Sequence, residues 1–365
     1  MPSVELNVIG LVAAALIAAL LVSFVSTPVV KALAQKMGAV DVPKDSRRMH
    51  DHPIPRMGGL AIFFGFTLST LVFLPLTEQL RGMLLWACLI VVLGILDDIY
   101  TLSAKLKFVV QIIAALIAVL HGNIITVISN PNIFSDNPYW DLGILSVPIS
   151  VLWVVGITNA VNLIDGLDGL ACCVSTISSM TMLVIALVVA EGDVAIIMAA
   201  LAGACIGFLP YNLNPAKIFM GDTGSTFLGF VLAVVSIQGL FKYAAIISFA
   251  VPFLMLALPI FDTCFAIIRR VSKGQSPMSP DRSHIHHRLI DMGFSQKQAV
   301  AVLYVISAIL GLSAVVLTTS GELRALLFLL ALCVAAGISA RIFLGHHSDH
   351  QPDPPGADKE DHHEP

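Results

Sequence analysis

The sequence predicts an all-α protein that crosses a lipid bilayer about eleven times. Of its 365 residues, 57% are hydrophobic and only 12% are charged, whereas soluble domains carry about 25% charged residues. A spanning helix needs about 20 apolar residues, and lipid leaves the backbone no partner outside its own helix. Eleven apolar runs, the third of them short, are therefore expected to form helices: 6–30, 57–76, 82–96, 106–122, 143–161, 170–190, 194–211, 224–240, 243–268, 298–318 and 322–344.

The basic residues favour one side of the membrane. When the gaps between the runs are assigned alternately to two sides, seventeen of the twenty Lys and Arg residues fall on one side. Cytosolic loops carry the excess of Lys and Arg, so the N-terminus is expected outside and the C-terminus in the cytosol. The first run lacks a basic segment before it and a clear cleavage site, which favours a retained helix over a signal peptide.

A single membrane domain, residues 1–344, accounts for all the apolar runs. The tail, residues 345–365, is rich in His, Pro and acidic residues and is expected to be disordered. Residues 121–142 contain turn residues and β-branched pairs, which predict a small β-hairpin on the outer side. The six cysteines have no C-x-x-C spacing, so neither disulfides nor zinc is expected.

Four polar clusters fall in the gaps assigned to the cytosol. The outer gaps hold only isolated acids. Chance placement would scatter the clusters over both sides, so their convergence favours a functional site on the cytosolic face. The clusters are "LDDIY", "NLIDGLDGL", "YNLNPAKIFMGDTGS" and "SPDRSHIHHRL".

Asp97 and Asp98 close the third run. A helix C-terminus carries a negative partial charge, so two adjacent carboxylates there need a compensating cation. Lys105 and Lys107 follow closely, and a divalent metal would also serve. The simpler alternative is ordinary polarity at the membrane interface.

The second and third clusters combine acids, amides and glycines. Asn159, Asn162 and Asp165 are three residues apart and would share one helical face. Gly166 would then end the helix and let a ligand approach the backbone. Asp222 lies between two glycines and suits either a helix cap or a loop that wraps a phosphate or a metal–phosphate complex.

The fourth cluster adds cations. Arginine binds phosphate through two parallel hydrogen bonds, and three histidines accompany the arginines here. Mg²⁺ uses one or two carboxylates and completes its shell with water and substrate phosphate. Together the clusters predict phosphoryl chemistry at the cytosolic surface of the membrane.

The chain resembles the polyprenyl-phosphate N-acetylhexosamine-1-phosphate transferases. The resemblance rests on "LDDIYTLSAKLKFVVQ", "NAVNLIDGLDGL", "NPAKIFMGDTGS" and "SPDRSHIHH" in that order, preceded by "HDHPIPRMGG". It implies transfer of GlcNAc-1-phosphate from UDP-GlcNAc to undecaprenyl phosphate with release of UMP. It also implies a bacterial plasma-membrane enzyme with a cytosolic active site, which starts teichoic acid, O-antigen or a related surface glycan.

The resemblance further implies Mg²⁺ as cofactor, with Mn²⁺ as an alternative, and roles for individual residues. Expected partners are the two substrates and the bilayer, not nucleic acid, and a homodimer is left open. The implied metal ligands are Asp98 and Asp222, and the implied catalytic residues are Asp97, Asp98 and Asp165. The implied substrate-binding residues are Lys107 for a phosphate, Phe219 for uracil, Asn162, Asp168 and Asn212 for the nucleotide–sugar, and Arg270, His284, His286 and His287 for the diphosphate.

Several other classes fit the sequence less well. Transporters place ionisable groups near the bilayer midplane and often contain repeats, whereas these acids lie at span ends and no repeat is evident. An intramembrane aspartyl protease needs G-x-G-D, but the sequence reads F-M-G-D. A CDP-alcohol phosphotransferase needs Ala-Arg where Cys172 and Cys173 stand. A membrane scaffold would not need four convergent polar clusters.

Overall fold

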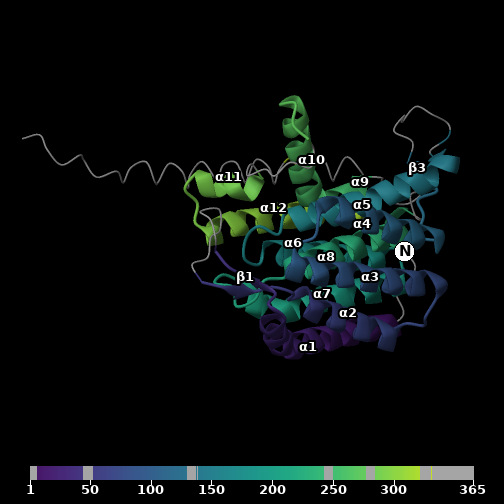
Figure 1. Cartoon of the computed structure of the whole chain (residues 1–365). Helices are drawn as coiled ribbons and strands as arrows, with labels where there is room; N and C mark the ends of the chain where they lie inside the picture. Colours follow the sequence, from purple (N-terminus) through teal and green to yellow (C-terminus); the bar gives the residue numbers. More distant parts are fainter. Residues whose placement is uncertain are drawn as a thin grey trace, which may run out of the picture.

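The computed structural model describes residues 6–43, 52–129, 137, 139–241, 250–276, 284–320 and 330. These residues form a bundle of long apolar helices (Figure 1). Within them, six helices are long and apolar enough to cross a membrane, which confirms a polytopic helical membrane protein. The total of eleven spans and their orientation remain predictions. The six are α1 (Leu6–Met37), α3 (Glu78–Tyr100), α5 (Ser146–Leu163), α6 (Leu170–Val188), α7 (Gly192–Asn212) and α12 (Gln296–Ser320).

Three shorter helices match three further apolar runs. They are α2 (Gly59–Phe73), α4 (Ala104–Leu120) and α8 (Gly221–Ser236), and α8 continues into a short π-helix, Ile237–Phe241. The predicted last span, 322–344, lies outside the described residues except for Leu330. The predicted disordered tail also lies outside them.

The ninth apolar run is interrupted, so the expectation of one continuous helix there is wrong. Helix α9 (Ala250–Met255) ends before Leu256, and α10 (Ala257–Ser272) begins after it. Pro259 has no N–H to donate to the carbonyl of Met255, four residues earlier. Ser178 Oγ of α6 donates to that carbonyl instead, at 2.8 Å. Figure 1 shows α10 at a steep angle to the bundle helices.

Two short hairpins lie at opposite ends of the bundle (Figure 1). Strands β3 (Val127–Ser129) and β4 (Tyr139–Asp141) pair antiparallel, which confirms the hairpin predicted within residues 121–142. Strands β1 (Val40–Asp41) and β2 (Ile54–Pro55) form a second antiparallel pair that the sequence did not predict. At two residues each, they are too short to show strand periodicity.

Helix α8 lies at the centre of the bundle, packed against α3 and α5. Every residue of α8 except Asp222 is buried. A helix that is apolar on all sides belongs in the interior, and the partly exposed Asp222 marks the end at which the cavity described below opens.

Gly94 brings α3 into direct contact with the N-terminus of α8. A Cβ atom at Gly94 would overlap the backbone of Thr223. Asp98 follows Gly94 by four residues and therefore lies on the same face of α3. The close approach at Gly94 thus carries the Asp98 carboxylate to the first turn of α8.

We predict that Gly94→Ala destabilises the protein. Overpacking costs about 1–3 kcal/mol, and the clash is with backbone atoms that cannot rotate away. A lower apparent Tm in detergent is the expected result. The matched control is Gly10→Ala in α1, where nothing lies within 4 Å of the added Cβ. Alanine favours a helix over glycine by about 1 kcal/mol, so the control should melt no lower than wild type. Equal Tm values for Gly94→Ala and wild type would contradict the close contact.

Candidate functional site

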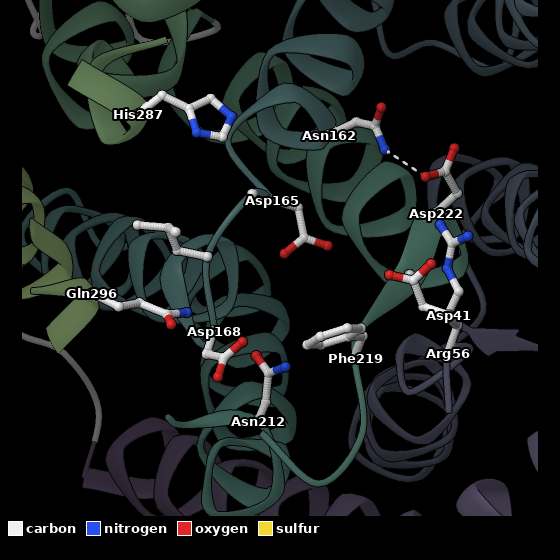
Figure 2. Close-up of a pocket in the computed structure, with 13 residues that line it drawn as sticks. Asp41, Arg56, Asn162, Asp165, Asp168, Asn212, Phe219, Asp222, His287 and Gln296 are labelled. Carbon is white, nitrogen blue, oxygen red and sulfur yellow. Dashed lines mark hydrogen bonds between the residues drawn. The ribbon is translucent and has the colours of Figure 1, made fainter. Parts of the chain in front are cut away.

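A cavity of about 340 Å³ gathers residues from parts of the chain that are far apart in sequence. Figure 2 shows acids, amides, one arginine, one aromatic ring and one histidine around it. Its lining consists of Asp41, Arg56, Asn162, Asp165, Gly166, Leu167, Asp168, Asn212, Phe219, Gly221, Asp222, His287 and Gln296.

Asp98 lies at the N-terminus of α8, beside the cavity but not in its lining. Its Oδ1 accepts the backbone N–H of Asp222 at 3.1 Å. Its Oδ2 accepts the N–H of Thr223 at 3.1 Å and the Thr223 hydroxyl at 2.6 Å. The first N–H groups of a helix lack partners inside it and carry a positive partial charge. Asp98 therefore compensates that charge and fixes the orientation of the first turn of α8.

Lys107 joins two of the predicted acids. Its Nζ lies 3.0 Å from Asp97 Oδ2 and 2.8 Å from Asp222 Oδ2. The other oxygen of Asp97 accepts the N–H of Leu102 at 2.7 Å, which holds the turn after α3. The cation that the sequence required beside Asp97 is thus Lys107. For Asp98 the compensating charges are the terminus of α8 and Arg56, whose Nε lies 3.4 Å from Oδ1.

Asn162 supports Asp222 from α5. Its Nδ2 donates to Asp222 Oδ1 at 3.2 Å and to Ser225 Oγ at 2.8 Å. The expectation that Asp165 continues the same helical face is wrong. Helix α5 ends at Leu163, and the N–H of Asp165 donates to the carbonyl of Asn162, three residues back, at 3.2 Å. This tighter turn moves Asp165 off the helix and into the cavity.

Asp165 has a strongly shifted acidity. Desolvation within the protein, together with the negative charges of Asp222 and Asp98, raises its pKa to about 8. At neutral pH the carboxyl group therefore retains its proton, as long as no cation lies beside it. In that form it can donate a hydrogen bond as well as accept one.

Asp168 orders the segment that leads from α7 to α8. Its Oδ2 accepts the side-chain amide of Asn214 at 2.9 Å and the N–H of Ala216 at 3.0 Å. The same Asn214 amide donates to Gln296 Oε1 at 2.9 Å. This network holds the segment that carries Phe219 to the cavity. Asp168 thus lines the cavity while its Oδ2 accepts hydrogen bonds from the protein itself.

Asn212 has one free acceptor at the cavity. Its Nδ2 donates to the carbonyl of Ile218 at 3.1 Å. Its Oδ1 is buried and accepts no hydrogen bond from the part of the chain that the structure describes. Buried polar atoms are normally paired, so this oxygen suits the N–H of a ligand.

One of the three predicted histidines, His287, lines the cavity. His284 is buried, and its Nδ1 lies 2.8 Å from Asp262 Oδ2. His286 is also buried, and its ring stacks on that of His284 with centroids 5.8 Å apart. Arg270 is buried in α10 and is likewise absent from the lining. The structure therefore does not bring Arg270, His284 and His286 to the cavity surface.

His286 packs against the turn that carries Asp165. A Cβ atom at Gly166 would overlap the His286 ring, so this contact requires glycine. Burial, together with the neighbouring charge of His287, lowers the pKa of His286 to about 3. His286 is therefore neutral at physiological pH and supports the turn by packing.

Four residues near the site were not predicted. Asp41 and Gln296 stand alone in the sequence, with no motif around them. Arg56 lies within "HDHPIPRMGG", a segment that supports the resemblance but assigns no role to the arginine. Asp262 could have been found, because a lone acid within an apolar run is a functional candidate by default.

The fold and the cavity define a polytopic helical membrane protein with a polar cavity among its apolar helices. Comparison with known proteins identifies the family within this class of membrane proteins. Residues 80–240 match the family model described as glycosyl transferase family 4. The chain is 44% identical over 331 residues to the "Probable undecaprenyl-phosphate N-acetylglucosaminyl 1-phosphate transferase" of Bacillus subtilis, an alignment that covers 90% of this chain and 91% of that protein.

Two more distant relatives have related names. The "Decaprenyl-phosphate N-acetylglucosaminephosphotransferase" of Mycolicibacterium smegmatis is 34% identical, over 83% of this chain and 80% of that protein. The "Undecaprenyl-phosphate alpha-N-acetylglucosaminyl 1-phosphate transferase" of Thermotoga maritima is 34% identical, over 73% of this chain and 78% of that protein. The chain therefore belongs to the polyprenyl-phosphate N-acetylglucosamine-1-phosphate transferase family and is a transferase.

The acidity of Asp165 predicts a pH-dependent stability in the absence of divalent cations. An ordinary Asp has a pKa of about 3.9, so between about pH 4 and pH 8 the folded chain keeps a proton that the unfolded chain loses. Stability from this group is complete below about pH 4 and declines as pH rises to about 8. Asp165→Asn cannot titrate. With EDTA present, the Tm of wild type minus that of Asp165→Asn should fall from pH 5 to pH 8. A constant difference would contradict the raised pKa.

Proposed function

We propose that this protein transfers GlcNAc-1-phosphate from UDP-GlcNAc to undecaprenyl phosphate and releases UMP. The observation that carries the proposal is the convergence of Phe219, Asn212, Asp165 and Asp222 on one cavity. These groups offer a ring for a base, an acceptor for an N–H, and carboxylates for a metal–diphosphate. The names of the relatives support both the donated group and the polyprenyl acceptor.

The uridine would bind at the end of the cavity that Phe219 and Asn212 form. Stacking on an aromatic ring contributes about 1–3 kcal/mol per base. The buried Oδ1 of Asn212 would accept an N–H of the uracil ring. Asp168 holds the segment between these two residues in place through Ala216 and Asn214.

The residues of the cavity fit a hard divalent cation such as Mg²⁺, with Mn²⁺ as an alternative. Asp165 and Asp222 both present carboxylates there, with Asn162 between them (Figure 2). Among the described residues, no three acidic, His or Cys side chains form a metal cluster, but Mg²⁺ needs only one or two carboxylates beside water and phosphate.

Within this set we assign Asp222 to the cation and Asp98 to the support of Asp222. Asp222 lines the cavity, whereas Asp98 does not, and its side chain is fully buried against the first turn of α8. A bound cation would supply Lewis-acid stabilisation of the diphosphate charge.

The proposed reaction is an attack by an oxygen of the lipid phosphate on the sugar-bearing phosphorus. The bond between this phosphorus and the bridging oxygen breaks, and UMP leaves with that oxygen and its electron pair. Phosphate monoesters have a second pKa of about 6, so the lipid phosphate is already largely ionised and no strong base is required. Positioning and charge compensation then supply most of the catalysis. Asp97 contributes by holding Lys107, and Lys107 by fixing Asp222.

The proposed location is the cytosolic face of a bacterial plasma membrane. The distribution of Lys and Arg over the predicted loops supports this orientation. The product, a lipid-linked diphospho-sugar, would start a surface glycan such as teichoic acid or O-antigen.

The test of the function is UMP release by purified protein with undecaprenyl phosphate and a panel of UDP-sugars. We expect turnover of UDP-GlcNAc and none of UDP-MurNAc-pentapeptide. The "SPDRSHIHH" segment resembles the branch of the family that uses the smaller donor. Equal turnover of both donors would contradict the assigned donor, and the absence of UMP release from every UDP-sugar would contradict the function.

The metal assignment predicts that Asp222→Asn lowers kcat at least a hundredfold, roughly 3 kcal/mol of barrier. The asparagine keeps the shape but removes the charge that would face the cation. A higher Mg²⁺ requirement is also expected. Asp193→Asn is the control, because Asp193 is exposed in the first turn of α7 and does not line the cavity. Near-normal kcat and Mg²⁺ dependence in Asp222→Asn would show that Asp222 does not hold the metal.

A further inference from the structure

The described part of the cavity wall is strongly acidic. Four aspartates line it, and Asp98 lies directly behind it. The diphosphate of a nucleotide–sugar is itself negatively charged, so its entry requires cationic groups that face the cavity. Lys107 does not line the wall, and its Nζ is already paired with Asp97 and Asp222. Within the described lining, the permanently charged cation is Arg56.

Backbone hydrogen bonds hold Arg56 next to the segment that leads into α8. Its own N–H donates to the carbonyl of Ala39 at 2.8 Å. On one side, the carbonyl of Pro55 accepts the N–H of Phe219 at 2.8 Å. On the other, Gly58 N–H donates to the Phe219 carbonyl and Gly59 N–H to the Met220 carbonyl, both at 2.9 Å. Arg56 is therefore fixed in register with Phe219, and hence close to Asp222.

The guanidinium group of Arg56 contacts Asp98 through its Nε atom, and the side chain also lines the cavity. Its Nε lies 3.4 Å from Asp98 Oδ1, and 30% of the side chain is exposed. Figure 2 shows the group beside Asp222, with the Asp41 carboxylate on its side toward Phe219, and Arg56 is among the residues that line the cavity. A guanidinium carries five N–H donors in a planar fork, so the Nη donors remain for an anion. Arginine binds phosphate oxygens in pairs with this geometry.

We propose that Arg56 is a phosphate-binding residue of this cavity. The inference rests on the proposed function and adds a contact that the four sequence clusters did not contain. Arg56 is held in register with Phe219, which would bind the base, and its guanidinium lies beside Asp222, which would face the cation. A phosphate of the donor that follows the uridine would reach its Nη atoms. The lipid phosphate offers the same chemistry, and the test separates the two sources.

A purely structural role for Arg56 makes a different prediction. If the guanidinium only neutralised buried Asp98, any positive charge at this position would suffice, and substrate affinity would not follow the phosphate content of the ligand. Two variants distinguish the roles. Arg56→Lys keeps a charge beside Asp98 but loses the fork, and Arg56→Gln loses both. Arg81→Gln is the matched control, because Arg81 is exposed on α3 and does not line the cavity.

The experiment measures KM for UDP-GlcNAc and for undecaprenyl phosphate, together with the shift in Tm caused by UMP and by uridine. Hydrogen bonds from a charged donor are stronger than neutral ones, so Arg56→Gln should raise the KM of the substrate whose phosphate it contacts about 10- to 100-fold. Arg56→Lys should fall between Arg56→Gln and wild type. The Tm shift caused by UMP should shrink in both variants, and the shift caused by uridine should not change.

Each possible result of these measurements either supports or overturns phosphate binding by Arg56. A higher KM for UDP-GlcNAc assigns the contact to the donor, and a higher KM for undecaprenyl phosphate alone assigns it to the acceptor. Unchanged KM values and an unchanged UMP shift in Arg56→Lys, with wild type active, would overturn the proposal and leave the function intact. A wild-type protein that releases no UMP would overturn the function. In that case a UMP shift that depends on Arg56 would still support phosphate binding, and its absence would reject it.

Discussion

The site depends on one interaction, the contact of the buried Asp98 carboxylate with the N-terminus of α8. A buried charge is costly unless it is paired and hydrogen-bonded. Asp98 satisfies this condition with two backbone N–H groups, the Thr223 hydroxyl and Arg56. The same bonds fix the peptide of Asp222, and the close contact at Gly94 makes them geometrically possible. The backbone position of Asp222 is therefore set by a residue 124 positions away.

Around this contact, charges of opposite sign hold one another in place before any ligand arrives. Lys107 links Asp97 to Asp222 across the space between α4 and α8, and Asn162 holds the second oxygen of Asp222 from α5. Such preorganised dipoles and charges need little reorganisation during a reaction. An apolar bundle also favours this arrangement, since each charge in it must find a partner within the protein.

The sequence predicts best what depends on local pattern. Long apolar runs predict helices because lipid requires them, and turn residues predict the β3–β4 hairpin. The break at Leu256 was not predicted, because the acceptor freed by Pro259 is satisfied by Ser178 of another helix. Three of the four clusters contribute to one cavity, through Asn162, Asp165, Asp168, Asn212, Phe219, Asp222 and His287, and Asp98 of the remaining cluster lies beside it. Arg270, His284 and His286 are buried elsewhere and do not line it. The motif alone could not predict this, because it does not show which of several neighbouring side chains face the cavity.

The aspartates illustrate why residue type alone does not assign a role. Asp97 and Asp98 are adjacent, yet one oxygen of Asp97 holds a turn and both oxygens of Asp98 hold a helix end. Asp165 and Asp222 come from different motifs, yet both face the cavity. The role of each aspartate depends on hydrogen-bond and ion-pair partners that are distant in sequence. The loss of the Asp97 or Asp98 carboxylate therefore acts through the geometry of Lys107 and α8. The loss of the Asp165 or Asp222 carboxylate instead removes a group that faces the cavity directly.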